Sequence, residues 1–341
     1  MTRRAVLVAG LLALVVAACG APLGAAPPAS PSPIAVTFMA GFKPQANLPF
    51  VAVYVAQEKG YFRAQGLDVT IEHATQSEHV RLLATGRVQF STADAANVLK
   101  WSAEQDVPMV SLALIGQRGQ QAFAVRADSG ISAPKDWEGK LVGFKGTPSA
   151  DYLAILKAAG VDRAKVREVS VGFDPRVFAE RKVDVYPLFK SNEPDLLAHL
   201  GVPIRLFDAA EYGVPTLGLT LVTSRDMVEK SPDVVRRFLR AALRGLSDAV
   251  ADRDAAVDAV MKYAPGEDRA HQRFMLDAEI RDAESDATRA NGLGWQTAEQ
   301  WKALERSLLD VGALGRDIDV DRVETDRFLR ESYRDGRVVW P

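Results

Sequence analysis

The stretch "YVAQEKGYFRAQGLDVTI", residues 54–71, contains a helix end, an aromatic corner and a strand in close succession. The helix that ends there is apolar on nearly every side, so we expect it to be buried. Gly60 suits the left-handed position that follows a last helical residue, and Tyr61 and Phe62 then lock the exit of the chain against the sheet. The alternating run 67–73 predicts a strand. A helix–corner–strand unit of this kind is typical of an α/β protein.

Strand-like runs recur along the chain and alternate with stretches of helical spacing. The expected strands are residues 34–40, 67–73, 88–92, 108–116, 121–127, 141–146, 166–171, 183–189, 203–208 and 218–224. The helical stretches between them include residues 77–84, 93–103, 149–159 and 193–200. This alternation predicts parallel sheets with helices on both faces. From Ser231 onward the pattern is helical, with Ser231 as N-cap and Pro232 at the first helical position.

Corners rich in glycine and proline near residues 117–125 and 212–222 predict two lobes joined by two crossings. One lobe would comprise residues 34–120 plus 220–341, and the other residues 121–219. Ligands of α/β sheets bind at the carboxyl ends of the strands, and a cleft between lobes is the favoured pocket.

Residues 1–18 predict a secretory signal peptide, because two arginines precede a short apolar run that ends in small residues. The run is shorter than the ~20 residues that a spanning helix needs. Cys19, which follows "VAA", completes the lipobox of a bacterial lipoprotein, so we expect its thiol to carry a lipid. It is the only cysteine, which excludes an internal disulfide and a multi-cysteine metal site.

Residues 19–33 continue with prolines among small residues and predict a tether. We therefore expect a folded body, anchored by its lipid, on the extracytoplasmic face of the cell membrane. The net charge of −2 provides no basic field for nucleic acid, and we expect a monomer without a nucleic-acid partner.

No catalytic motif, metal site or cofactor is predicted. The four histidines have no zinc-binding spacing, and the chain has no G-x-S-x-G elbow and no G-x-x-x-x-G-K-[ST] loop. The sequence therefore favours a binding protein over an enzyme.

The lipobox, the tether and the two-lobed body together resemble the solute-binding proteins of bacterial ABC importers. Within that class, residues 54–62 with 66–69 resemble the family of thiamine-precursor, riboflavin and aliphatic-sulfonate binders. Further matches are residues 86–90, 94–96, 136–140, 183–186 and 192–194. The resemblance implies a two-lobed periplasmic-binding-protein type II fold with its ligand cleft between the lobes. It also implies an ABC permease and an ATPase as partners.

The candidate ligand-binding residues lie in loops that follow expected strands, at the crossings, or at helix starts. They are Phe42, Gln45, Asn47, Thr92, Asp94, Gln120, Phe144, Thr147, Tyr186, Asn192, Glu193 and Tyr212. Asn47 and Asp94 have an alternative role as helix N-caps. Glu193 at a buried strand end needs a partner, which would be the ligand or Lys190. Trp295 either caps the cleft or packs in the core.

These aromatic and amide side chains suit a flat heterocycle stacked between aromatic rings. Thiamine-pyrimidine binders resemble one another in a Pro-Asn-x-x-His pattern at the first loop, and this chain lacks the histidine there. That difference favours riboflavin. A thiamine pyrimidine precursor, an alkanesulfonate or nitrate-type anion, and an extracytoplasmic enzyme of the same fold are the alternatives.

Overall fold

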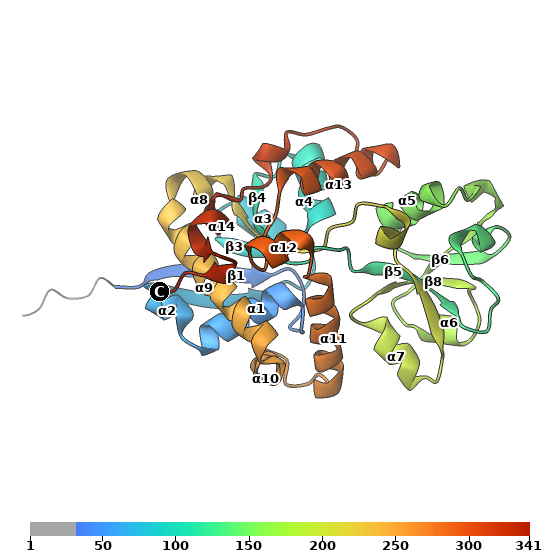
Figure 1. Ribbon diagram of the computed structural model, residues 1–341, viewed down its shortest axis with the longest axis horizontal. Helices are drawn as coiled ribbons and strands as arrows, with labels where there is room; N and C mark the ends of the chain where they lie inside the picture. Colours follow the sequence, from blue (N-terminus) through green and yellow to red (C-terminus); the bar gives the residue numbers. More distant parts are fainter. Residues whose placement is uncertain (1–31) are drawn as a thin grey trace, which may run out of the picture. The chain divides into compact units, whose positions relative to one another are not determined.

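The computed structural model describes residues 32–341, which form two five-stranded sheets, a two-stranded ribbon and the helices that cover them (Figure 1). The predicted signal peptide, Cys19 and nearly all of the predicted tether lie outside the described residues. Among residues 32–341, no helix has both the length and the apolar character to cross a membrane.

The ten strands predicted from the sequence are all present, and a short ribbon follows them near the end of the chain. The strands are β1 (Ile34–Ala40), β2 (Leu67–His73), β3 (Phe90–Asp94), β4 (Met109–Leu114), β5 (Gln121–Arg126), β6 (Leu141–Lys145), β7 (Arg167–Val171), β8 (Val185–Phe189), β9 (Ile204–Phe207), β10 (Leu219–Ser224), β11 (Tyr333–Arg334) and β12 (Arg337–Val338).

The helices follow the predicted spacing, with the long helical region after β10 covering the first sheet (Figure 1). They are α1 (Leu48–Glu58), α2 (Tyr61–Ala64), α3 (Glu78–Ala84), α4 (Ala95–Gln105), α5 (Ala150–Ala158), α6 (Arg176–Ala179), α7 (Glu193–His199), α8 (Arg225–Lys230), α9 (Pro232–Ala251), α10 (Arg253–Tyr263), α11 (Arg269–Asp282), α12 (Asp286–Asn291), α13 (Ala298–Asp310) and α14 (Arg327–Ser332). Ser231 precedes α9 as predicted, although its side chain makes no capping hydrogen bond.

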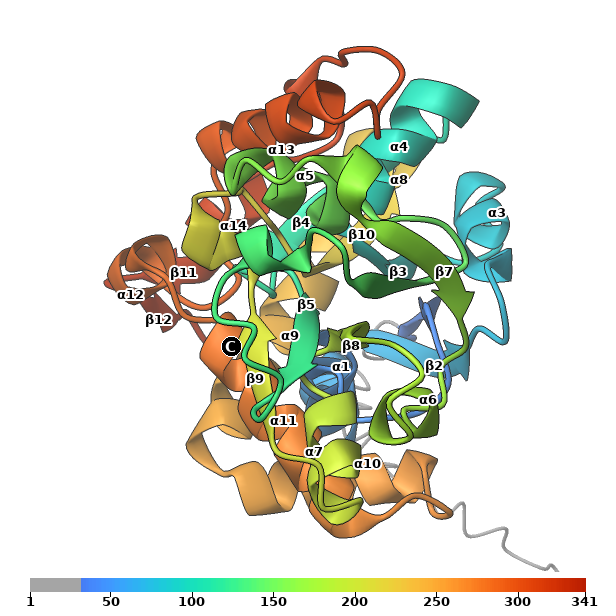
Figure 2. The ribbon, with the colours of Figure 1, turned by 90° about the vertical axis from the view of Figure 1, so that its right-hand side faces the viewer.

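The first sheet has the order β2-β1-β3-β10-β4 and the second the order β7-β6-β8-β5-β9. We call the part of the chain around the first sheet lobe 1 and the part around the second lobe 2. In Figure 2, which faces lobe 2, strands β5, β8 and β9 lie in front of the lobe 1 helices α1 and α9.

The prediction of parallel sheets is wrong for β5 and β10. β10 is antiparallel to both β3 and β4, and β5 is antiparallel to both β8 and β9. Both strands enter their sheets directly from a crossing between the lobes. Leu219, the first residue of β10, pairs with Asp94 at the end of β3, and Gln121, the first residue of β5, pairs with Phe189 at the end of β8. A strand that starts where its neighbours end must run antiparallel to them.

The helix and corner from which the fold was predicted have the expected structure. Residues 48–56 of α1 are all buried, and Gly60 has a φ of 71°. Helix α1 packs so closely on α9 that a Cβ at Gly245 would overlap the carbonyl oxygen of Ala52, so only glycine fits there. The ring of Phe62 stacks on Phe238 of α9 at 5.1 Å, and Phe238 stacks in turn on a phenylalanine of β3. The corner is therefore locked to the sheet through α9.

Candidate functional site

Most of the predicted site residues lie within or just after the strands β1, β3, β6 and β8. The carboxyl ends of β1 and β3 in lobe 1, and of β6, β7 and β8 in lobe 2, lead into loops. Helix α11 makes contacts with loops from both lobes. We call these loops, the crossing between β4 and β5, and α11 together the lobe junction. In Figure 1, α11 lies between the main bodies of the two lobes.

On the side of lobe 1, α11 holds the loop that follows β1. The Gln272 side chain accepts a hydrogen bond from the Ala46 backbone N–H at 2.7 Å. The Glu279 carboxylate accepts from the Asn47 side chain at 3.0 Å and from the Leu48 backbone N–H at 3.3 Å. Asn47 occupies the N-cap position of α1 but makes no capping bond. Glu279, which the sequence did not single out, therefore satisfies the free N–H at the start of α1.

On the side of lobe 2, α11 contacts the start of α7. His271 Nε2 lies 2.9 Å from Asn192 Oδ1, and His271 Nδ1 lies 2.7 Å from a carboxylate oxygen of Asp195. These contacts join residues far apart in the chain, so no local sequence pattern predicts them.

A second link between the lobes is ionic. Lys190 Nζ lies 2.6 Å from an Asp208 carboxylate oxygen in lobe 2 and 3.0 Å from an Asp282 carboxylate oxygen at the end of α11. Gln120 donates its side-chain N–H to Asp282 at 2.9 Å, and Gln120 Oε1 is buried without a partner among the described residues. The predicted site residues Asn47, Gln120 and Asn192 thus all lie at the lobe junction.

The end of β3 carries Thr92 and Asp94 close to the first loop. Thr92 Oγ1 accepts the Gly41 backbone N–H at 3.0 Å, and Asp94 caps α4 by accepting from the Ala96 N–H at 3.0 Å. His79 of α3 is buried beside Gly41, and its Nδ1 has no partner among the described residues. The sequence did not single out His79 as a site residue, although it stands in the first turn of a helix that follows a strand.

Carboxyl groups with raised pKa values gather at the junction. Burial raises the pKa of Asp94 to about 6. Burial, followed by the charges of Asp94 and Asp208, raises the pKa of Asp151 in α5 to about 7. Burial also raises the pKa of Glu279 to about 7. Near neutral pH, the carboxyl groups of Asp151 and Glu279 are therefore partly protonated and can donate as well as accept hydrogen bonds.

The remaining lobe 1 candidates, Phe42 and Gln45, lie in the first loop. The ring of Phe42 is 51% exposed. Gln45 donates its side-chain N–H to Asn47 at 2.5 Å. Trp295 is partly buried and packs against the core of lobe 1, which agrees with the second of its two expected roles.

The lobe 2 candidates are spread more widely. Phe144 is half-buried on β6, and Thr147 is exposed in the loop that follows. Tyr186 on β8 is fully buried, and its ring stacks on Phe178 at 5.7 Å. Tyr212 packs against a core cluster of lobe 2. These residues do not form one compact group with Asn192.

Of the two partners considered for Glu193, the ligand and Lys190, Lys190 is wrong. Glu193 forms an ion pair with Lys145, whose strand β6 lies next to β8, and both side chains are almost fully buried. Its second carboxylate oxygen accepts the Phe189 backbone N–H at 2.8 Å. Lys190 instead follows β8 on the side that faces Asp208 and Asp282, so it pairs with them.

Lys145 also lies within reach of three aromatic rings. Its Nζ is 5.1 Å from the ring centroid of Phe173, 5.2 Å from that of Tyr186 and 5.1 Å from that of Phe189. Phe173 and Phe189 are 71% and 40% exposed, respectively. The sequence did not single out Lys145, Phe173 or Phe189 as site residues, and the contacts between them depend on which strands are neighbours.

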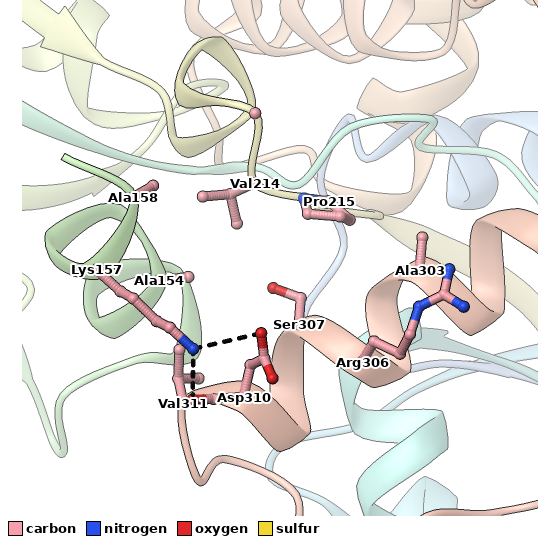
Figure 3. A pocket seen from close by; sticks show the side chains of 11 residues that line it. Ala154, Lys157, Ala158, Val214, Pro215, Ala303, Arg306, Ser307, Asp310 and Val311 are labelled. Atoms are coloured by element: carbon pink, nitrogen blue, oxygen red, sulfur yellow. Dashed lines mark hydrogen bonds and ion pairs between the residues drawn. The ribbon is translucent and has the colours of Figure 1, made fainter. Parts of the chain in front are cut away.

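A separate cavity of about 410 Å³ lies where α5 of lobe 2 meets α13 of lobe 1 (Figure 3). Val214 and Pro215 of the second crossing form part of its wall, and Lys157 Nζ reaches an Asp310 carboxylate oxygen across it at 3.3 Å. None of the predicted site residues lines this cavity. Its walls come from both lobes, so its shape depends on how far the lobes are closed.

The chain matches one family model and several known proteins. The family model described as NMT1/THI5 like matches residues 47–256. The riboflavin-binding protein RibY of Chloroflexus aurantiacus is 29% identical, with 94% of this chain and 95% of that protein covered. The formylaminopyrimidine-binding protein of Halalkalibacterium halodurans is 29% identical, with 76% and 80% covered.

Among solved structures, the periplasmic aliphatic sulphonate-binding protein SsuA of Escherichia coli is similar to this chain. The TM-score is 0.68 at 13% identity, with 85% of this chain and 92% of that chain covered. At this identity the likeness shows the fold, which is the two-lobed fold of periplasmic binding proteins.

Proposed function

This chain belongs to the NMT1/THI5-like family, and from that premise we propose that it is the solute receptor of an ABC importer and not an enzyme. It captures a flat heteroaromatic vitamin, riboflavin foremost, between its lobes and delivers it to a permease that an ATPase drives. Similarity to a riboflavin-binding protein over nearly the whole of both chains supports this proposal.

The observation that carries the proposal is the placement of exposed phenylalanines. Phe42, Phe173 and Phe189 are all more than a third exposed, and each lies at or just after the carboxyl end of a strand. Exposed rings of this size lose favourable burial free energy unless something covers them. A flat ring ligand would cover them by stacking.

The charged groups at the junction favour a neutral ring compound as the ligand over a sulfonate. Lys145 and Lys190 already have carboxylate partners, since Lys145 pairs with Glu193 and Lys190 with two aspartates. The further cations Lys100 and Arg118 also lie close to carboxyl groups of the junction. The additional carboxyl groups of Asp94 and Asp151 would repel an anion when they are ionised.

The ligand carried through purification tests the proposal. The protein is produced in rich medium, and the absorption spectrum of any bound compound is recorded after denaturation. We expect the visible absorption of a flavin. A protein that carries no flavin and binds taurine by calorimetry, but no ring compound, would overturn the proposal.

We also propose that Cys19 carries a lipid that holds the body at the extracytoplasmic face of the membrane. The lipobox sequence supports this, since Cys19 lies outside the described residues. Stable anchoring needs more than one acyl chain, which lipidation of such a cysteine supplies. Cys19→Ala should move the protein from the membrane fraction to the soluble fraction or stall its processing. Normal processing and unchanged membrane association would contradict the proposal.

A further inference from the structure

Lys145 is a buried cation whose hydrogen-bonding capacity is only partly used. Its side chain is 6% exposed and that of its partner Glu193 is 1% exposed. An ammonium has three N–H donors, and among the described residues only the Glu193 carboxylate accepts from it. A buried ion pair offsets its desolvation cost well only when further hydrogen bonds satisfy the remaining donors. The two other N–H groups of Lys145 are therefore available to an acceptor that is not part of the chain.

The surroundings of this ammonium are aromatic and, on one side, open to solvent. The rings of Phe173 and Phe189 are both centred 5.1 Å from Lys145 Nζ, and both are exposed. Because both rings lie close to Lys145 Nζ, they border the same space beside it. Stacking one flat ring between two others needs about 7 to 8 Å between the outer rings. The distances to Nζ allow the two ring centres to be that far apart.

The position of the group fits a ligand site. Lys145 ends β6, Phe189 ends β8, and Phe173 follows β7, so all three lie at one edge of three neighbouring strands in the order β7-β6-β8. The residues directly after Phe189 belong to the lobe junction, where Lys190 and Asn192 contact α11. The group is therefore on the same edge as the proposed ligand site.

We propose that Lys145, Phe173 and Phe189 form a ring clamp, in which the two phenyl rings hold the faces of the ligand and the Lys145 ammonium donates to a carbonyl oxygen at its edge. The clamp rests on the proposed function, and it narrows the proposed ligands to ring compounds that carry a carbonyl oxygen at one edge. The flavin ring has such an edge, whereas taurine has neither a ring nor a carbonyl.

Phe173→Ala and Phe189→Ala test the two walls of the clamp. Both side chains are exposed, so neither change threatens the fold. Each change should weaken the binding of riboflavin roughly three- to tenfold, measured by fluorescence quenching. Lumichrome, a closely related ring compound without the ribityl tail, should show the same fold-change because the clamp holds the ring. Leu206→Ala removes another exposed apolar side chain of lobe 2 and should leave both affinities unchanged.

The double change Lys145→Met with Glu193→Gln tests the Lys145 end of the clamp, because it leaves no unpaired buried charge and the Gln side chain can still accept the Phe189 backbone N–H. It should fold and weaken riboflavin at least tenfold, the loss expected for a hydrogen bond to a charged group. If the wild type binds riboflavin and all these variants bind it as tightly as Leu206→Ala does, the clamp is wrong and the proposed function stands. If the wild type binds no ring compound, the proposed function fails and the clamp fails with it.

Discussion

The two lobes present opposite chemistry to the junction between them. The edge of lobe 1 is polar, with Thr92, Asp94 and the buried His79 near the first loop. The edge of lobe 2 is aromatic, and its buried cation Lys145 is neutralised by Glu193. A ligand held by both edges would need a flat apolar face for one and hydrogen-bond donors for the other. If the proposed function is right, this difference would let the protein bind the face and the edge of a ring through different side chains.

The largest expected effect comes from breaking the ion pair of lobe 2. Lys145→Met leaves Glu193 buried without its charge partner and should lower the free energy of unfolding by about 3–5 kcal/mol, measured by urea denaturation. Lys182→Met removes an exposed lysine that pairs with Glu180 in the same lobe and should cost less than about 1 kcal/mol. Equal losses in the free energy of unfolding would show that the buried ion pair stabilises the fold no more than the exposed one does.

Opening the junction should have the next largest effect. Lys190→Met leaves Asp208 and Asp282 facing each other across the lobes without the cation between them. Their repulsion should favour the open form and weaken ligand binding about tenfold, a cost of about 1.4 kcal/mol. Small-angle scattering should show a larger radius of gyration. Lys157→Met removes the exposed link between α5 and α13 and serves as the control. An unchanged radius in Lys190→Met would contradict the role of this link.

The polar edge of lobe 1 and the facing Asp151 of lobe 2 predict a pH dependence. The pKa of Asp94 is raised to about 6 and that of Asp151 to about 7. A carboxyl group with a raised pKa in the folded state stabilises the fold while it is protonated, below about pH 4, and this stability is lost as the pH rises through the raised value. Between about pH 4 and pH 8 the free energy of unfolding should therefore fall.

Asp151→Asn should reduce that fall by about 1–2 kcal/mol, measured by urea denaturation at a series of pH values. Asp226→Asn removes an exposed carboxylate of α8 and should leave the profile unchanged. A profile for Asp151→Asn that coincides with the wild type would show that this carboxyl group does not titrate in the expected range.

The smallest expected effect concerns the one exposed ring of lobe 1. Phe42→Ala removes a single stacking surface and should weaken riboflavin binding by about 0.5–1.5 kcal/mol, measured by calorimetry. Ile34→Ala changes an exposed side chain at the opposite end of β1 and should have no effect on binding. A loss with Ile34→Ala as large as that with Phe42→Ala would place the ligand elsewhere.

The sequence predicted the strands and the buried helix α1 because their signals are local. Alternation, the apolar run of α1 and the glycine at its end all lie within a few residues of one another. The antiparallel direction of β5 and β10 was not predictable in this way, because it depends on the edge at which a crossing enters the sheet. The partner of Glu193 was missed for a related reason, since Lys145 is 48 residues away and meets it only because β6 adjoins β8.

The candidate site shows the same limit. Asn47, Gln120 and Asn192 were singled out from their place after strands or at a crossing, and they lie at the lobe junction. The contribution of α11, through Glu279 and His271, had no sequence signal because α11 lies far along the chain from the loops it contacts. Contacts of this range follow from the packing of the lobes.

Riboflavin fluorescence, followed while the wild-type protein is added at neutral pH, tests the central claim most directly. A flavin stacked on the exposed rings of the junction should lose most of its emission, and the loss should saturate at one flavin per protein. Taurine in excess should not restore the emission. Emission that stays constant at protein concentrations well above the micromolar range would contradict the claim that the junction binds a flat ring.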